Sequence, residues 1–423
     1  VEARWSTIIN TPAPQLNVAL DTALHSIATS SKQLKECFVE GTFTTRNLAS
    51  KDIKMVVDEV NKISHKTFGE EKDLIGRVYE YFLKEFAVNA TKEEGEYYTP
   101  HDVVQMIAAM IEPFDGALYD PCCGSGGMFI QSAELVRAKK GDINRINVYG
   151  QEKEAATYRL AQMNLALRGI SHNLGGASDS SFTHDLHKGL YFDYIMANPP
   201  FNLSNWGAEQ LKDDVRWQYG MPPASNANFA WLQHMIYHLA PGGRMGMVLA
   251  NGSLSSQSGG EGDIRKNIVN ADLVDCIIAM PTQLFYTTQI PVSLWFISKR
   301  KKQAGKTLFI DARKMGDMVS RKLRELTDED IKKIADTYNA YVNGTLEDVK
   351  GFCAVVDTEK IAEQDYILTP GRYVGVEEQE DDGEPFEEKM ARLTSELSDL
   401  FKQSHKLEAE IKEKLGAIGY HVE

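Results

Sequence analysis

From Gly95 to Arg300, short apolar runs that end in turn residues alternate with stretches of helical periodicity. This alternation predicts an α/β fold with a mostly parallel, doubly wound sheet, because such a sheet buries its apolar strands beneath helices on both faces. Ligands of doubly wound sheets bind beyond the carboxyl ends of the strands, so we expect the site in the turns that follow these runs. The expected strands include 117–119, 146–149, 194–197, 245–249 and 293–297.

The chain has 423 residues, which is enough for two or three structural units. Apolar residues recur at helical spacing within 53–63 and again within 74–86, and this predicts a helical N-terminal domain. Because the chain begins with Val1 and not with Met, we expect this domain to be incomplete. The predicted units are this helical domain (1–90), a catalytic domain (91–305), a C-terminal extension of its core (306–376), an acidic linker (377–385) and a long amphipathic helix (386–418).

The predicted C-terminal helix has apolar residues that alternate by four and three, from Phe386 and Met390 to Leu407 and Ile411. This register is typical of a coiled-coil arm that docks on another helix. The alternative is an amphipathic helix that packs against its own domain.

The formal net charge of −14 argues against a surface devoted to nucleic acid, because contacts to phosphate need clustered lysine and arginine. Part of the negative charge is confined to one acidic stretch between Glu377 and Glu388. Any surface that faces DNA is therefore expected to be a patch, or to belong partly to another subunit.

The sequence has neither an apolar run of about 18 residues, the length that a membrane span needs, nor a signal peptide at its start. We therefore expect a cytoplasmic location without a membrane anchor. The five cysteines are scattered and lack metal-ligand spacing. They predict reduced thiols, with neither a disulfide framework nor a metal site.

A glycine-rich turn follows the first apolar run and precedes a helical stretch. Its glycines let the backbone approach a ligand closely, and the helix N-terminus offers free amide donors. The turn lacks the ending of a phosphate-binding loop and the spacing of a dinucleotide fingerprint. This favours a ligand whose polar end carries a carboxylate and an amine, such as the methionine part of S-adenosylmethionine, and the alternative is an ordinary tight turn. The cofactor-binding candidates here are Asp120, Gly124, Ser125, Gly126 and Gly127.

Two acidic residues are further candidates for cofactor binding. Glu152 follows the second apolar run, where a carboxylate can accept both ribose hydroxyls of a nucleoside, although an acid at a helix start has the same sequence pattern. Asp179 lies where a third strand is expected to end, and it could accept from the adenine amino group of the cofactor. Its alternative is a polar turn residue.

A third cofactor-binding motif precedes the glycine-rich turn. It predicts a helix start, with Thr99 as the N-cap, Pro100 in the first helical position and Asp102 completing a capping box. A helix N-terminus next to aromatic residues also makes a good wall for a cofactor. The candidates for this wall are Glu96, Tyr97, Tyr98, Thr99, Pro100 and His101.

The most informative motif is an apolar strand that stops at Asn198, Pro199, Pro200 and Phe201. Two successive prolines remove amide donors and leave carbonyl groups as acceptors. The Asn198 side-chain oxygen and the Pro199 carbonyl can hold both hydrogens of an exocyclic amine, whose delocalised lone pair makes it a poor nucleophile. Phe201 could stack on a base taken out of the duplex. These four residues are the catalytic candidates, and the alternative is a plain turn.

Two long segments follow the strands of the predicted site. Loop 202–227 contains two tryptophans and a pair of prolines, and 251–262 is rich in glycine and serine. Both are long enough to serve as mobile lids beside the site.

In this order, the motifs resemble the N6-adenine DNA methyltransferases, and more closely the modification subunit of type I restriction-modification systems. The resemblance runs from about Asp73 to Tyr373. It implies a Rossmann-like, S-adenosylmethionine-dependent methyltransferase domain and site-specific methylation of adenine flipped into the catalytic pocket. The motifs that carry it are 96–100, 120–127, 198–201, 228–231 and 284–291.

The same resemblance implies that 96–101, 125–127 and Glu152 line the cofactor pocket, and that 198–201 line the catalytic pocket. One departure is Cys122 followed by Cys123, where such proteins commonly have one cysteine beside a small polar residue. We expect this difference to change packing and not activity.

The resemblance also implies partners. These are duplex DNA, a specificity subunit that reads the DNA sequence, a second modification subunit and, in some assemblies, a restriction subunit. The C-terminal helix and the N-terminal domain are the expected contacts. This agrees with the acidic charge and with the lack of a large extra domain for base readout.

Two other functions compete with this hypothesis. Similar Asn-Pro-Pro-aromatic turns serve methyltransferases that act on protein glutamine or on guanine in RNA. A scaffold protein that kept the fold without catalysis is the second alternative. The helical N-terminal region, the wall motif and the long arm favour DNA over protein or RNA, and retention of Glu152 and Asn198 argues against a scaffold.

Overall fold

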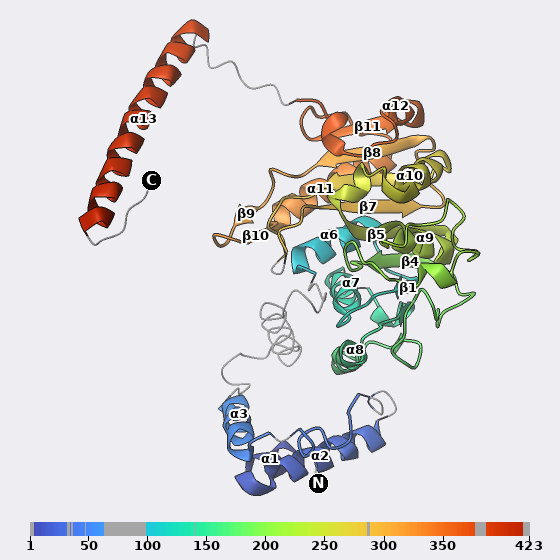
Figure 1. The fold of residues 1–423 in the computed structure, drawn as a ribbon. Coiled ribbons are helices and arrows are strands. Elements are labelled where there is room, and N and C mark those ends of the chain that lie inside the picture. Colours follow the sequence, from blue (N-terminus) through green and yellow to red (C-terminus); the bar gives the residue numbers. More distant parts are fainter. Residues whose placement is uncertain are drawn as a thin grey trace. The chain divides into compact units, whose positions relative to one another are not determined.

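The computed structural model describes residues 4–31, 34, 37–46, 48–62, 99–139, 141–285, 288–376 and 386–417. The chain forms two compact units, Val1–Val376 and Glu377–Glu423. The first unit contains the sheet and the second contains one long helix (Figure 1).

The first unit is built on a nine-stranded sheet with the order β11-β8-β6-β7-β5-β4-β1-β2-β3. Strand β7 is antiparallel to both of its neighbours and β11 is antiparallel to β8, whereas the other pairs are parallel. The mostly parallel sheet expected from the apolar runs is therefore confirmed. The strands are β1 (Gly116–Asp120), β2 (Ile146–Gly150), β3 (His172–Asn173), β4 (Phe192–Ala197), β5 (Leu239–Ala250), β6 (Val274–Ala279), β7 (Val292–Ser298), β8 (Lys306–Asp311) and β11 (Cys353–Asp357).

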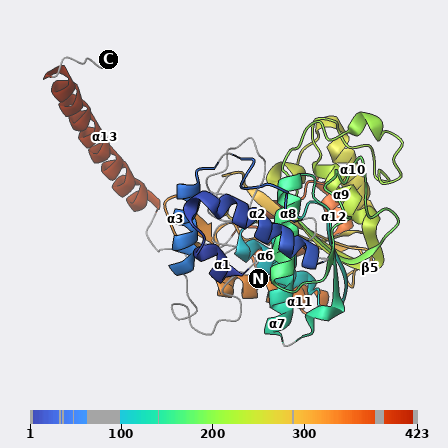
Figure 2. The same cartoon turned by 90° about the horizontal axis from the view of Figure 1, so that it is seen from below.

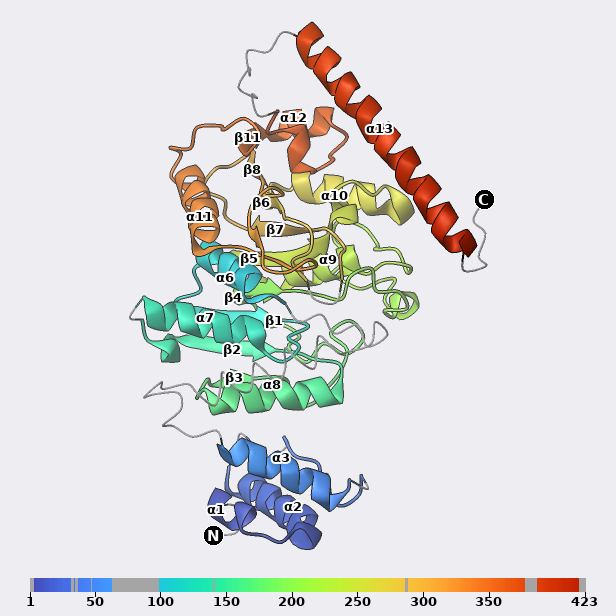
Figure 3. The ribbon, with the colours of Figure 1, turned by 90° about the vertical axis from the view of Figure 1, so that its left-hand side faces the viewer.

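Helices cover both faces of the sheet, because alternate residues of each buried strand point to opposite sides. On β7, for example, Phe296 joins one core and Trp295 joins the other. One core is completed by α6 (His101–Ile111), α7 (Gly127–Ala138), α8 (Ala155–Leu167) and α11 (Asp328–Val342), which face the viewer in Figure 3. The other core is completed by α9 (Asn228–His238), α10 (Glu261–Asn270) and α12 (Thr358–Glu363), which lie together in Figure 2.

The segment that follows β7 extends the same sheet. Strands β8 and β11 add to its far edge, and α11 packs against α6. Helix α11 starts with a capping box in which Thr327 and Asp330 satisfy each other's backbone amides. A separate two-stranded hairpin, β9 (Asp317–Met318) and β10 (Arg324–Glu325), precedes it.

The described part of the N-terminal region is helical. Helices α1 (Trp5–Ile9), α2 (Ala13–Ser30) and α3 (Ser50–Lys62) share a small core. On α3, the predicted stripe is only partly correct, because Ile53 and Val57 are buried whereas Val56 is 62% exposed. A narrow stripe suffices because α3 packs mainly against α2. Ile63 and the second predicted stripe, 74–86, lie outside the described residues.

The second unit is α13 (Phe386–Ala417), the long C-terminal helix that the sequence predicts. Its apolar side chains are 42–60% exposed, and they are Met390, Leu393, Leu397, Leu400, Phe401, Leu407 and Ile411. In the part of the chain that the structure describes, no helix is long and apolar enough to cross a membrane.

The two predicted lid segments are packed. In loop 202–227, the indoles of Trp206 and Trp217 are buried, and they donate to the carbonyls of Pro223 and Leu211. Within 251–262, the segment folds into the short helices η4 (Asn251–Leu254) and η5 (Ser258–Gly260). Loop 202–227 is therefore packed on the domain and is not an extended flap, because its tryptophans join the core beneath α9.

Candidate functional site

A pocket lies at the carboxyl ends of β1 and β4 and brings together residues that are far apart in the sequence. It is lined by predicted residues from the wall motif, the glycine-rich turn and the candidate catalytic turn (198–201), namely Thr99, His101, Asp120, Gly124, Ser125, Gly127 and Asn198. Six other lining residues were not predicted as site residues, namely Val104, Cys122, Cys123, Met128, Gln131 and Asn164. The carboxyl edge of the sheet is thus where the pocket forms, as a doubly wound fold predicts.

The glycine-rich turn exposes its backbone to this pocket. Gly124 and Gly126 have φ angles of +54° and +84°, which are left-handed conformations that glycine adopts without strain. A Cβ atom added to Gly124 or Gly127 would meet no atom of the described residues within 4 Å. The turn therefore leaves room for a ligand to approach the main chain at the start of α7.

Glu152 braces this turn from the neighbouring strand. Strands β1 and β2 pair in parallel with Asp120 opposite Gly150, so the residues after them lie side by side. The Glu152 carboxylate accepts from the backbone N–H of Gly124 (3.0 Å) and from that of Glu154 (2.8 Å). It is adjacent to the pocket but is not one of the residues that line it.

Asp120 is a buried carboxyl group in the wall of the pocket. Burial raises the pKa of Asp120 to about 7, and the nearby charge of Glu152 acts in the same direction. The backbone N–H of Cys122 donates to it (3.0 Å) and partly opposes this rise. A cationic group placed in the pocket would favour the ionised form of Asp120.

Asn198 follows β4, and its two side-chain polar atoms have different environments. Its Nδ2 donates to Thr99 Oγ1 (2.9 Å), whereas its Oδ1 is buried and has no hydrogen-bond partner among the described residues. Leaving a buried acceptor unpaired costs about 1–3 kcal/mol, so such groups are rare in native proteins. The Thr99 bond fixes the orientation of this amide, and Asn198 is one of the residues that line the pocket.

The predicted role of Thr99 as an N-cap is wrong. Helix α6 begins at His101 with Pro100 as the N-cap residue, and no side chain bonds the cap. Asp102 does not close a capping box, because its carboxylate accepts from the N–H groups of Val103 (2.9 Å) and Leu326 (2.7 Å). The tertiary contacts of Asp102 with the segment before α11, and of Thr99 with Asn198, replace the local cap.

The rest of the candidate catalytic turn is held by contacts with Asn228 and Phe285. Asn228, at the start of α9, accepts from the N–H of Asn202 (3.0 Å) and donates to the Asn202 side chain (3.0 Å). Phe201 is only 8% exposed, and its ring meets that of Phe285 edge to face with centroids 5.9 Å apart. Neither Phe201 nor the two prolines are among the residues that line the pocket.

Asp179 lies close to Glu152 but outside the pocket lining. Strand β3 ends at Asn173, earlier than the sequence predicts, so Asp179 belongs to the loop beyond it. Its N–H donates to the Glu152 carbonyl (3.0 Å), and its carboxylate pairs with His184 (2.5 Å). The hydrogen bond from His184 lowers the pKa of Asp179. Its proposed contact with adenine stays a prediction.

Among the remaining candidates, Pro100 and Gly126 are the N-cap residues of α6 and α7. Glu96, Tyr97 and Tyr98 lie outside the described residues. Of the lining residues that were missed, Asn164 had a detectable signal, since it is a polar residue on the buried face of α8. Its side chain donates to the Ser125 carbonyl (2.8 Å) and so supports the glycine-rich turn.

Comparisons with known proteins agree with this geometry. The family model described as N-6 DNA Methylase matches residues 70–382. The chain is 52% identical over 350 residues to the type I restriction enzyme HindI methylase subunit of Haemophilus influenzae. The matched region covers 82% of this chain and 79% of that protein.

Solved structures share the fold. The type I restriction-modification methyltransferase subunit from Streptococcus thermophilus superposes with a TM-score of 0.74 at 27% identity, covering 88% of this chain and 80% of that one. A candidate class I S-adenosylmethionine-dependent methyltransferase from Listeria monocytogenes matches with a TM-score of 0.52 at 12% identity, over 81% of this chain and 98% of that one. The first match supports membership of the same family, whereas the second shows only that the fold is shared. Together with the sequence matches, they show that this chain belongs to the N-6 DNA methylase family, among the methyltransferase subunits of type I restriction-modification systems.

Proposed function

We propose that this chain transfers the methyl group of S-adenosylmethionine to the exocyclic N6 amino group of adenine in DNA. The observation that carries the proposal is the buried, unpaired Oδ1 of Asn198 in the wall of the pocket. An amine hydrogen of the substrate would supply the missing hydrogen bond.

The residues around the pocket fit the proposed cofactor. The open space over Gly124 and Gly127 suits close approach to the main chain, and Asp120 offers a carboxyl group for the amino group of the methionine part. Glu152, at the tip of β2, is the proposed acceptor for the ribose hydroxyls. When bound, the cofactor supplies an electrophilic methyl group on a sulfonium.

Asn198 and Pro199 would prepare the adenine amine. The lone pair of this amine is delocalised into the ring, so the nitrogen is a weak nucleophile. Hydrogen bonds from its two hydrogens to Asn198 Oδ1 and to the Pro199 carbonyl favour a pyramidal nitrogen with a localised lone pair. Positioning and preorganised dipoles of this kind lower a barrier without a covalent enzyme intermediate.

The target adenine must leave the duplex to reach this pocket. We assign Phe201 as the ring on which the extruded base stacks. Because Phe201 packs against Phe285 in the present structure, stacking requires this pair to separate. Opening one aromatic contact costs about 0.5–1.5 kcal/mol beyond the area that it buries, and stacking of the base on the ring contributes about 1–3 kcal/mol in return.

The partners follow from the family and from two features of the chain. The net charge of −14 leaves much of the grip on DNA to another subunit, and the apolar stripe of α13 is exposed in this chain. We propose that a specificity subunit and a second modification subunit bind α13 and the N-terminal helices, with a restriction subunit in complete assemblies. Target choice then lies outside this chain.

The test is methyl transfer from labelled S-adenosylmethionine, with the chain assembled with a specificity subunit. We expect label in duplex DNA, and nucleoside mass spectrometry should identify it as N6-methyladenine. Parallel reactions with a glutamine-bearing protein substrate and with RNA test the alternatives. Label confined to protein or RNA would contradict the proposal, as would failure to bind the cofactor in calorimetry.

A further inference from the structure

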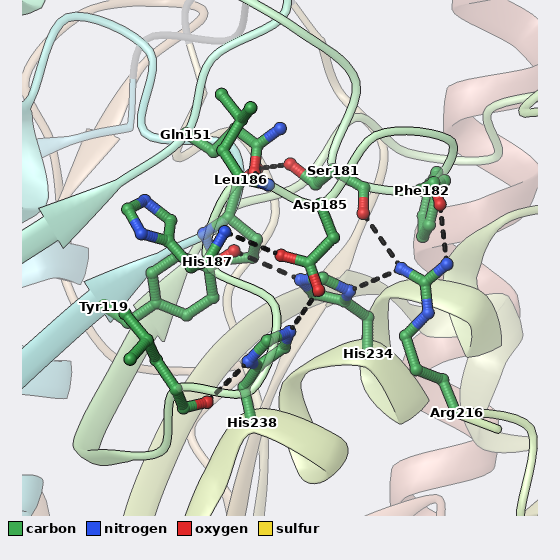
Figure 4. Close-up of polar contacts among 12 residues, drawn as sticks. Tyr119, Gln151, Ser181, Phe182, Asp185, Leu186, His187, Arg216, His234 and His238 are labelled. Carbon is green, nitrogen blue, oxygen red and sulfur yellow. Dashed lines mark hydrogen bonds and ion pairs between the residues drawn. The ribbon is translucent and has the colours of Figure 1, made fainter. Parts of the chain in front are cut away.

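Arg216 lies in loop 202–227, between the catalytic turn and α9, and its side chain is only 5% exposed. All five of its N–H donors are paired, and Figure 4 shows the bonds to Ser181, Phe182 and His234. Its Nε and Nη2 bind both oxygens of Asp214 (2.8 and 2.7 Å), its Nη1 donates to the Ser181 carbonyl (2.9 Å) and to His234 Nδ1 (3.0 Å), and its Nη2 also donates to the Phe182 carbonyl (2.6 Å). A guanidinium bound in this way is held in one orientation.

Ser181 and Phe182 belong to segment 179–186, which is fixed on its other side by the tip of β2. Gln151 donates to the carbonyls of Asp179 (3.2 Å) and His184 (2.8 Å), and it accepts from the Leu186 N–H (3.1 Å). The segment is therefore held between Gln151 and Arg216. It carries Asp179, the proposed contact for the cofactor adenine.

The same segment reaches the glycine-rich turn. The Ser181 hydroxyl donates to the carbonyl of Pro121 (2.5 Å), a residue that lies between the lining residues Asp120 and Cys122. Arg216 is thus linked to the main chain of the cofactor pocket through Ser181. Through its own loop, it is also continuous with the catalytic turn.

His234 supplies a third connection, from α9 to β1. Because Arg216 donates to His234 Nδ1, the ring hydrogen is on Nε2, which faces the Tyr119 hydroxyl (3.2 Å). Burial, together with the charges of His238 and Arg216, keeps the pKa of His234 well below its usual value, so the ring is neutral and can accept. Tyr119 immediately precedes Asp120 on β1.

We propose that Arg216 is a positioning residue for methyl transfer, which locks segment 179–186 and loop 202–227 together so that the cofactor pocket and the catalytic turn keep one relative geometry. The inference rests on the proposed function. Lysine cannot replace Arg216 in this role, because a single ammonium group cannot bind a carboxylate in bidentate fashion and two carbonyls and an imidazole at once.

The test compares Arg216→Lys with Arg265→Lys. Arg265 is also buried and also binds carbonyls, those of Tyr366, Ser253 and Ser256, but it does not bridge the two segments. For Arg216→Lys in the assembled complex, we expect kcat for DNA methylation to fall about 100-fold, since a displacement of about 1 Å can cost that much. The Kd for S-adenosylmethionine should change by less than about fivefold, because Gln151 still holds the segment.

Arg265→Lys should lower Tm by about as much as Arg216→Lys does. Its kcat, measured well below Tm, should stay within about twofold of the wild-type kcat. Asp214→Asn, which keeps the shape of the pair but removes its charge, provides a milder break if Arg216→Lys does not fold. If Arg216→Lys or Asp214→Asn retains the kcat of the Arg265 control, the proposal is overturned.

Hydrogen exchange separates this inference from the proposed reaction. In Arg216→Lys, the amides of segment 179–186 and of loop 202–227 should both exchange faster. In Arg265→Lys, their exchange should match that of the wild type. If the wild-type complex methylates no DNA, the proposed function fails, and the exchange data still decide whether Arg216 joins the two segments. Unchanged exchange in both segments of Arg216→Lys would refute the proposal that Arg216 joins them.

Discussion

Two polar regions flank the carboxyl end of β1, and they differ in how completely their hydrogen bonds are satisfied. In the pocket, Asn198 keeps a buried acceptor unpaired and Asp120 is buried as a carboxyl group with a raised pKa. On the other face of the sheet, Arg216 has every donor paired. The unsatisfied region is able to bind a ligand, whereas the satisfied one fixes the loops around it.

The largest effect is expected from a variant in the fully hydrogen-bonded region around Arg216. His238 is fully buried, and both of its ring nitrogens face oxygen acceptors, the Leu190 carbonyl (2.9 Å) and the Asp185 carboxylate (3.0 Å). Asp185→Ala would remove the acceptor that faces this ring and the acceptor of the His187 N–H (3.0 Å). Each unpaired buried group costs about 1–3 kcal/mol, so we expect a loss of about 2–6 kcal/mol in the free energy of unfolding. Chemical denaturation measures it.

The matched control is Glu209→Ala, which breaks the exposed pair with Lys212. It should leave the free energy of unfolding almost unchanged, because solvent screens an exposed ion pair. Similar losses for the two variants would mean that the buried pair contributes no more than a surface one.

The second effect concerns catalysis. Asn198→Ala removes the proposed acceptor of the amine, and loss of one preorganised hydrogen-bond partner of a transition state costs roughly 100- to 1,000-fold in kcat. Stability should change little, because the variant loses the hydrogen bond to Thr99 but also removes a buried unpaired oxygen. Cofactor binding by calorimetry and methyl transfer by label are the measurements.

Asn267→Ala is the control for this variant, since Asn267 is an exposed residue of α10 that donates to the Tyr219 carbonyl. It should retain full activity. Loss of cofactor binding and of transfer in equal measure for Asn198→Ala would assign Asn198 to the cofactor pocket instead.

The third effect depends on pH. The pKa of Asp120 is about 7 in the folded protein and about 3.8 for the free side chain, so the folded state keeps a proton that the unfolded chain loses between these values. This group therefore destabilises the fold progressively as pH rises from about 4 to 7. Between pH 4 and pH 8, the free energy of unfolding of Asp120→Asn should therefore rise by about 1–3 kcal/mol relative to that of the wild type. Parallel curves for the two proteins, from denaturation at several pH values, would show that Asp120 does not titrate in this range.

The smallest effect isolates the space above the glycine-rich turn. Gly124 and Gly169 both have positive φ angles, +54° and +66°, and open space at the Cβ position. Changing either to Ala should cost about 1–2 kcal/mol of stability for the left-handed backbone. Only Gly124→Ala places a methyl group in the pocket, so it alone should raise the Kd for S-adenosylmethionine, by about tenfold. Equal Kd values in the two variants would place the ligand elsewhere.

The sequence predicted the sheet well because short apolar runs bounded by turns are a local signal. It also identified most of the residues of the pocket, since Asn198 and the glycine-rich turn follow strands directly. It failed at Thr99, where the local pattern of a helix cap was complete but a distant partner, Asn198, took the side chain. Local propensity is a weak guide when a tertiary contact competes for the same atom.

The satisfied region was not predicted at all. Arg216, Gln151 and His234 belong to different segments, and nothing in the spacing of their residue types indicates that they meet. Charged and polar residues in loops are usually solvated, so their burial here could not be inferred without the fold. The same holds for β8 and β11, whose place at the sheet edge depends on long-range pairing.

The edges of the sheet also limit how this protein can associate with others. Strand β3 offers only two residues, too few to template another chain. At the opposite edge, the turn before β11 folds back so that Val349 bridges Cys353 and Asp348 accepts from the Val355 N–H (2.8 Å). Both edges are thus blunted against strand addition, which protects a large sheet from edge-to-edge aggregation. Among the described residues, this sheet is then a poor docking edge, which favours contacts through helices and loops, where side chains and not main-chain ladders select the partner.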